Sequence, residues 1–186
     1  MTQEHEDIIQ GIERFLQQDP KENTFFPVPL EFDLAEHLYQ VNLSSLLDLK
    51  TYISPQSESD REIQKIANKL LCREEILPLI VEKLETALEI DPETEESKMQ
   101  DRSKLIVINF NAREIDFMND DLLEIDMIER ETQKTLQPDS EWEELSKEIQ
   151  RNAISLLYAL NLGFTNAGGN PRENFEEFKR KRENES

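Results

Sequence analysis

The stretch SEWEELSKEIQRNAISLLYAL, residues 140–160, decides the fold class of this 186-residue chain. Ser140 followed by Glu143 has the form of a capping box, in which side chains satisfy the free N–H groups at a helix start. Apolar side chains then recur at three- and four-residue spacing in one stripe: Trp142, Leu145, Ile149, Ala153, Leu156, Leu157 and Leu160. The spacing predicts a long amphipathic helix that packs one face on a core.

Similar stripes predict that most of the remaining chain is helical. The expected helices are residues 4–18, two short helices within 33–52, residues 63–71, a helix that starts near Pro78, residues 122–136 and residues 172–182. Asp33 is a plausible N-cap, Asn42 is expected to cap or interrupt, and residues 162–171 are expected to end the preceding helix. Only four glycines are present, which disfavours a fold with many tight turns. We therefore expect a mainly α-helical protein, an irregular helical bundle with at most one short strand or hairpin.

LIVINF at residues 105–110 is the one strong strand candidate, because it is short and rich in β-branched residues. A single strand needs a partner to satisfy its backbone. Residues 22–32, ENTFFPVPLEF, hold two prolines that favour an extended strap anchored by Phe25, Phe26 and Phe32. The strap, a second copy of the protein or another polypeptide could each supply the partner strand.

Residues 91–103, DPETEESKMQDRS, carry almost no apolar side chain and mark the best candidate linker. This predicts an N-terminal helical part at residues 1–90, an acidic linker at 91–103, and a strand with C-terminal helices at 104–186. One domain overall is the other possibility.

The charge of the chain is strongly negative. Asp and Glu number 41 against 21 Lys and Arg, a formal net charge of -20, with a pI near 4.4. Such a surface repels nucleic-acid phosphates and anionic lipid headgroups, so we expect no direct nucleic-acid binding and no membrane association. The longest apolar runs are also far shorter than the roughly 20 residues that span a bilayer.

The single cysteine, Cys72, cannot form an internal disulfide, and the start MTQEHEDIIQ lacks the basic and apolar regions of a signal peptide. We therefore expect a cytoplasmic protein. Cys72 ends an apolar stripe, and His37 lies beside another, so both are interpreted as packing residues rather than reactive groups.

The sequence predicts no catalytic residue, no cofactor and no metal ligand. Neither His5 nor His37 has flanks typical of a nucleophile site, and one Cys with two distant His cannot form a zinc site. AGGN at residues 167–170 lacks the Lys and Ser or Thr of a phosphate-binding loop and is interpreted as an interhelix turn.

Carboxylates at helical spacing leave an enzymatic alternative open. The pairs are Glu82 with Glu85, Asp121 with Glu124, Glu141 with Glu144, and Glu173 with Glu176. Paired acids on neighbouring helices can hold Mg²⁺, as in all-α nucleotide hydrolases. Because a chain with 41 acids supplies such pairs by chance, a carboxylate-metal nucleotide hydrolase is the second alternative.

Acidic residues are densest at 82–101 and 114–131, which either only confers solubility or serves a docking function. The main hypothesis is a non-catalytic adaptor, chaperone-like protein or regulatory subunit that binds a basic partner protein or complex. The alternative is a DNA mimic that inhibits a nucleic-acid-binding protein. The expected partner-binding residues combine acids with aromatic anchors: Asp120, Asp121, Glu124, Trp142, Phe175 and Phe178.

Overall fold

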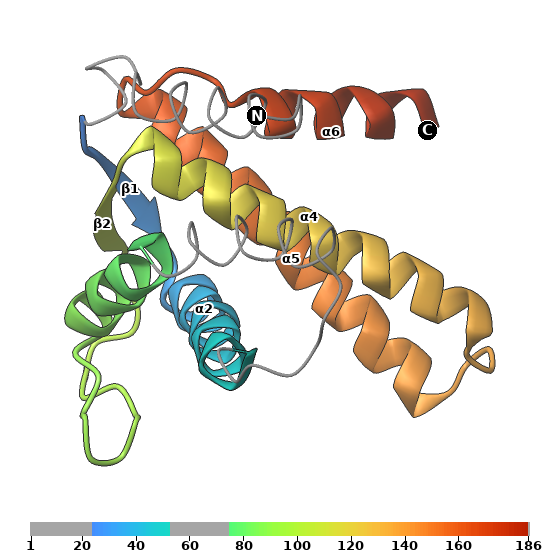
Figure 1. The fold of residues 1–186 in the computed structure, drawn as a ribbon, viewed down its shortest axis with the longest axis horizontal. Coiled ribbons are helices and arrows are strands. Elements are labelled where there is room, and N and C mark those ends of the chain that lie inside the picture. The colour runs from blue at the N-terminus through green and yellow to red at the C-terminus, as the bar shows by residue number, and fades with distance from the viewer. Residues whose placement is uncertain (1–23, 53–74, 186) are drawn as a thin grey trace, which may run out of the picture.

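A computed structural model describes residues 24–52 and 75–185. The predictions at His5, residues 4–18, residues 63–71 and Cys72 lie outside these ranges. The described elements are β1 (Phe26–Leu30), α2 (Phe32–Tyr52), a helix that includes residues 75–88, β2 (Ile106–Phe110), α4 (Ala112–Thr135), α5 (Glu141–Asn166) and α6 (Glu173–Glu185) (Figure 1). The expected mainly α-helical fold with at most one short strand pair is confirmed.

The strap supplies the partner of the predicted strand. β1 and β2 pair antiparallel, with Phe26 opposite Phe110 and Leu30 opposite Ile106. Residues alternate between buried and exposed along both strands, so each strand turns one face to the core. Among the three partners left open by the sequence, the structure therefore shows the strap.

Two prolines determine which backbone groups of the sheet are paired. Pro27 lies opposite Asn109 and Pro29 opposite Val107. Proline has no N–H to donate to the neighbouring strand. Both prolines therefore occupy non-hydrogen-bonded pairs, and β1 bonds to β2 through the residues between them. Val107 and Asn109 then direct their backbone groups to the outer edge of β2. Lys83 Nζ donates to the Asn109 carbonyl at 3.0 Å, which agrees with this assignment.

α4 and α5 form a long antiparallel pair (Figure 1). The expected start of α5 is confirmed, since the Ser140 side chain accepts from the Glu143 N–H at 3.1 Å. α4 begins at Ala112 rather than residue 122. A capping box of Asn111 and Glu114 directly after β2 explains the earlier start.

The prediction of two short helices within residues 33–52 is wrong. α2 is one continuous helix, and Asn42 neither caps nor interrupts it, because its side chain donates to the Leu38 carbonyl one turn back. Residues 75–77 are already helical, and the start of this helix near Pro78 stays a prediction because the preceding residues lie outside the described ranges. α5 ends at Asn166, where Ala167 caps it, so the helix ends within residues 162–171 as expected.

Residues 89–98 form a hydrogen-bonded turn. The Asp91 N–H donates to Glu96 O at 2.8 Å, the Lys98 N–H donates to Glu89 O at 3.0 Å, and Ile90 pairs with Ser97. The three-part division of the chain stays a prediction. The core itself combines residues from both sides of 91–103.

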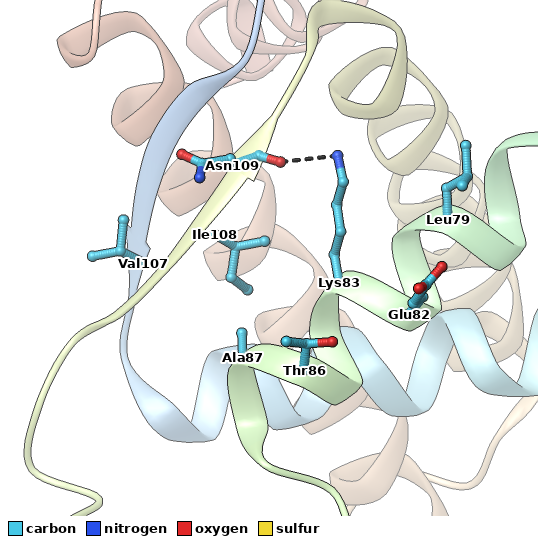
Figure 2. A pocket seen from close by; sticks show the side chains of 8 residues that line it. All are labelled: Leu79, Glu82, Lys83, Thr86, Ala87, Val107, Ile108 and Asn109. Atoms are coloured by element: carbon cyan, nitrogen blue, oxygen red, sulfur yellow. Dashed lines mark hydrogen bonds between the residues drawn. The ribbon is translucent and has the colours of Figure 1, made fainter.

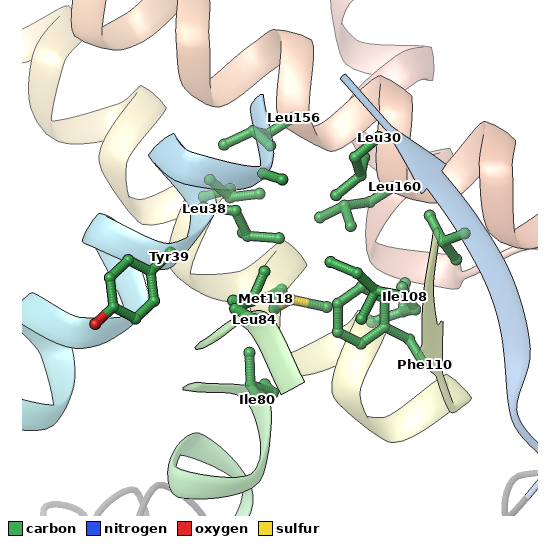
Figure 3. Packing of buried hydrophobic residues seen from close by; sticks show 14 of the residues in the cluster. Leu30, Leu38, Tyr39, Ile80, Leu84, Ile108, Phe110, Met118, Leu156 and Leu160 are labelled. Carbon is green, nitrogen blue, oxygen red and sulfur yellow. The ribbon is translucent and has the colours of Figure 1, made fainter. Parts of the chain in front are cut away.

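The core lies where α2, residues 75–88, the sheet, α4 and α5 meet (Figure 3). Its fully buried members come from all five: Leu30, Leu38, Leu77, Ile80, Leu84, Phe110, Ile115, Leu156 and Leu160. Fully burying side chains of this size stabilises the fold by roughly 1.5–3 kcal/mol each.

Buried amides fix the register of α4 against α5 and α6. Asn119 and Asn161 exchange hydrogen bonds of 3.0 and 2.8 Å, and Asn119 also donates to Asn174 at 3.0 Å. Sliding one helix along the other would leave these buried groups unpaired. Each unpaired group costs about 1–3 kcal/mol.

β1 packs against α5 at Gly163. A Cβ at this position would lie 2.8 Å from Val28 Cγ1 and 3.3 Å from Pro29 Cδ. Only a residue without a side chain allows the strand and the helix to approach this closely.

We expect Gly163→Ala to lower the free energy of unfolding by about 1–3 kcal/mol, because overpacking outweighs the gain in helix propensity. Urea unfolding of the two proteins measures the change. Ser155→Ala, an exposed position on the same helix, is the control and should be neutral or slightly stabilising. Val28→Ala combined with Gly163→Ala should cost less than the sum of the two single changes. A neutral Gly163→Ala would contradict the close packing.

Candidate protein-docking surface

The apolar stripe of α5 divides into a buried half and an exposed half. Leu156 and Leu160 are fully buried in the core. Trp142 and Leu145 continue the same face of the helix at three- and four-residue spacing, yet Trp142 is 70% exposed and Leu145 is exposed as well. The apolar stripe therefore extends beyond the end of the core.

The apolar side chains of α4 also change from buried to exposed along the helix. Ile115, Met118 and Leu122 are buried, whereas Met127 and Ile128 are exposed. Past Leu122 on α4 and before Ala153 on α5, the described chain has no buried hydrophobic residue. We call residues 126–150 the distal hairpin.

Polar side chains hold the distal hairpin together. Ser146 donates to the Glu129 carboxylate at 2.6 Å, and Gln150 donates to the Asp126 carboxylate at 2.8 Å. Gln133, one turn of α4 beyond Glu129, donates to Gln150 at 3.1 Å. The contacts between the two helices of the distal hairpin thus include polar side chains, while Met127, Ile128, Trp142 and Leu145 are exposed. Figure 1 shows this end of α4 and α5 projecting away from the sheet.

The distal hairpin is also acidic. It holds eight Asp and Glu against three Lys and Arg, a formal charge of -5. The hydrogen bond from Lys147 lowers the pKa of Glu143, so that this carboxylate stays ionised beside Trp142. The exposed apolar side chains are therefore surrounded mainly by negative charge.

A groove of about 400 Å³ lies between α2 and α5, and its lining includes a residue of the distal hairpin. Asp33, Glu36 and His37 line it from α2, and Glu148 lines it from α5. Burial lowers the pKa of His37, and the nearby Glu148 carboxylate opposes part of this shift. His37 is half-buried on its helix, in agreement with the prediction that it packs.

Two of the aromatic residues expected to bind a partner are buried. Phe175 and Phe178 are only 3% and 7% exposed, because both rings pack edge-on against Tyr158 of α5. Trp142 and Tyr158 are 16 positions apart on one helix, about 24 Å along its axis. The structure therefore does not bring Trp142 together with the aromatic rings of α6.

The three predicted acidic residues lie on α4, before the distal hairpin. The Asp120 carboxylate is exposed but accepts from Asn174 of α6 at 3.0 Å. Asp121 is buried, and Glu124 is half-buried. Their part in binding a partner stays a prediction, as it does for the aromatic residues.

Leu145, Met127 and Ile128 are surface residues that the sequence analysis did not select. The stripe containing Leu145 was visible, but its spacing is the same in the buried and exposed halves. The polar residues Asp126, Ser146 and Gln150 at the helix contact were the available signal.

No group of three His, Cys, Asp or Glu side chains within residues 24–52 and 75–185 is arranged to hold a metal ion. In the same ranges, no helix combines the length and the apolar character needed to cross a bilayer. The chain matches no family model, no curated protein and no solved structure.

We expect His37 to make folding sensitive to acid. Its folded pKa lies below the unfolded value of about 6.5, so this contribution to stability is present above that value and is lost as the pH falls through the folded pKa. On going from about pH 7.5 to about pH 5.5, His37→Gln should lose less free energy of unfolding than the parent chain. Glu148→Gln should lose more, because it removes the carboxylate that raises the pKa of His37. Equal losses in urea unfolding of all three proteins would contradict this role.

Proposed function

We propose that this chain is a non-catalytic protein-interaction module, an adaptor, chaperone-like protein or regulatory subunit, that docks a basic partner protein through the distal hairpin. One observation carries the proposal. The apolar stripe that builds the core on α5 continues into an exposed region at Trp142 and Leu145.

Trp142 has the properties of a binding anchor. Tryptophan is enriched among the residues that supply most of the energy of protein interfaces, because it buries a large area with few rotatable bonds. Leu145, Met127 and Ile128 add exposed apolar area on the same hairpin. A partner that covers these side chains gains the hydrophobic energy that the chain itself leaves unused.

The charge of the distal hairpin determines the kind of partner. At -5 it attracts a basic surface and accelerates the encounter, while a second copy carries the same negative charge and is repelled. The apolar anchor then supplies affinity that salt does not screen. If the affinity for the partner depended strongly on salt and only weakly on Trp142, the contact would be electrostatic alone.

We further propose that this docking takes place in the cytoplasm. A single cysteine in 186 residues is compatible with a reducing compartment.

We expect Trp142→Ala with Leu145→Ala to weaken capture of a basic partner about 30-fold, since truncating central anchors costs roughly 2 kcal/mol or more. The tagged full-length chain is used for affinity purification from its own cells at low and high salt, with mass spectrometry of the bound proteins. The captured basic protein is then titrated against the parent and variant chains.

Leu162→Ala is the matched control, because Leu162 is also a leucine of α5 with 55% exposure but lies outside the distal hairpin. It should bind as the parent does. The proposal fails if no stoichiometric basic partner is found, or if all three chains bind it equally. A captured protein that normally binds DNA, and that DNA displaces, would instead support the mimic.

A further inference from the structure

Within residues 24–52 and 75–185, the outer edge of β2 borders a groove of about 480 Å³ (Figure 2). Leu79, Glu82 and Lys83 line the groove from the helix of residues 75–88, and Val107 and Asn109 line it from β2. This groove is at the sheet, away from the distal hairpin (Figure 1).

The two outer edges of the sheet differ in their ability to accept another strand. Pro27 and Pro29 remove two N–H donors from the outer edge of β1, as natural edge strands often do to prevent pairing. The outer edge of β2 keeps the N–H and carbonyl of Val107 and the N–H of Asn109. No described segment pairs with β2 on this side, because the sheet consists of β1 and β2 within the described ranges.

Lys83 occupies one end of this edge. Its ammonium donates to the Asn109 carbonyl at 3.0 Å and to both oxygens of Glu114 at 2.6 and 2.7 Å. The ion pair neutralises Lys83 and leaves Glu82 to set the charge of the groove. The part of the edge that no described segment pairs with is centred on Val107.

The chemistry of the groove identifies the class of segment that fits it. Leu79 and Val107 are large exposed apolar side chains, and Val107 is 57% exposed. Residues 75–89 contain four Glu and one Lys, so the helix beside the edge attracts positive charge. An added strand directs alternate side chains to opposite faces, which suits a sequence of alternating character.

We propose that the outer edge of β2 binds an extended segment of a partner protein, in which basic and apolar residues alternate, as a third strand of the sheet. Backbone hydrogen bonds to Val107 hold the segment, and Leu79 and Glu82 select its side chains. A second copy of this chain is the less suitable occupant, because it carries the same charge of -20.

The test uses a synthetic peptide of alternating Lys and Val, titrated into the full-length chain by calorimetry. Two further peptides carry N-methyl groups on all Lys or on all Val residues. A strand pairs through the N–H groups of alternate residues, so we expect one methylated peptide to bind and the other to lose binding. Binding by charge alone would not distinguish the two peptides.

Val107→Pro tests the protein side of the contact. Val107 lies opposite Pro29, so the change removes an outward N–H and no ladder bond to β1. We expect peptide binding to weaken about tenfold or more. Val107→Thr keeps the N–H but changes the side chain, so it should weaken binding less than Val107→Pro does, and circular dichroism verifies that each variant is folded.

Trp142→Ala should bind the peptide unchanged, which separates this site from the docking surface on the distal hairpin. The inference is overturned by an absence of peptide binding, by equal binding of the two methylated peptides, or by undiminished binding to folded Val107→Pro. It is also overturned if light scattering finds a dimer of the parent chain that Val107→Pro dissociates, because the edge then pairs with a second copy. If Val107→Pro does not fold, the methylated peptides still decide.

Discussion

The pairing of β1 with β2 is the interaction on which the rest of the described fold depends. It joins Phe26 to Phe110 across most of the N-terminal half of the chain and turns the inner faces of both strands to the core. The inward side of β1 then packs on α5 so closely that Gly163 has no room for a Cβ. The capping box of Asn111 and Glu114 directly follows β2, so the sheet also fixes where α4 begins. A strand pair of ten residues thereby positions α4 and α5.

The same pairing leaves the sheet asymmetric. Proline on one strand and none on the other means that only the edge of β2 presents complete backbone donors and acceptors. Lys83 donates a hydrogen bond to the Asn109 carbonyl at that edge, and its ion pair with Glu114 neutralises its charge. The edge at Val107 and the exposed stripe at Trp142 have a common cause. At Val107 no described strand pairs with the outer edge of β2, and at Trp142 α5 extends beyond the end of the core.

The local pattern of apolar residues and caps was sufficient to predict much of this fold. It did not show which apolar side chains are exposed. The stripe and cap at Ser140 predicted α5, and the β-branched run predicted the strand at residues 105–110, with the proline strap as one of three possible partners. The start of α4 was missed because Asp116, Asp120 and Asp121 weaken its apolar periodicity, and tertiary contacts of Ile115 and Met118 supply the stability that the pattern does not show. Phe175 and Phe178 resembled exposed aromatics on a charged helix, since no local signal indicates that Tyr158 packs against them.

The polar contacts inside the distal hairpin explain how an apolar surface can be kept there. Asp126, Gln150 and Ser146 hold the helices together by hydrogen bonds, so α4 and α5 remain paired without burying their outer apolar side chains. A hydrophobic contact between the helices would have drawn those side chains inward. In the proposed docking function, the surrounding carboxylates would repel a second copy of the chain and attract a surface of opposite charge. Stability of the pair and availability of the surface are thus assigned to different residues of the same two helices.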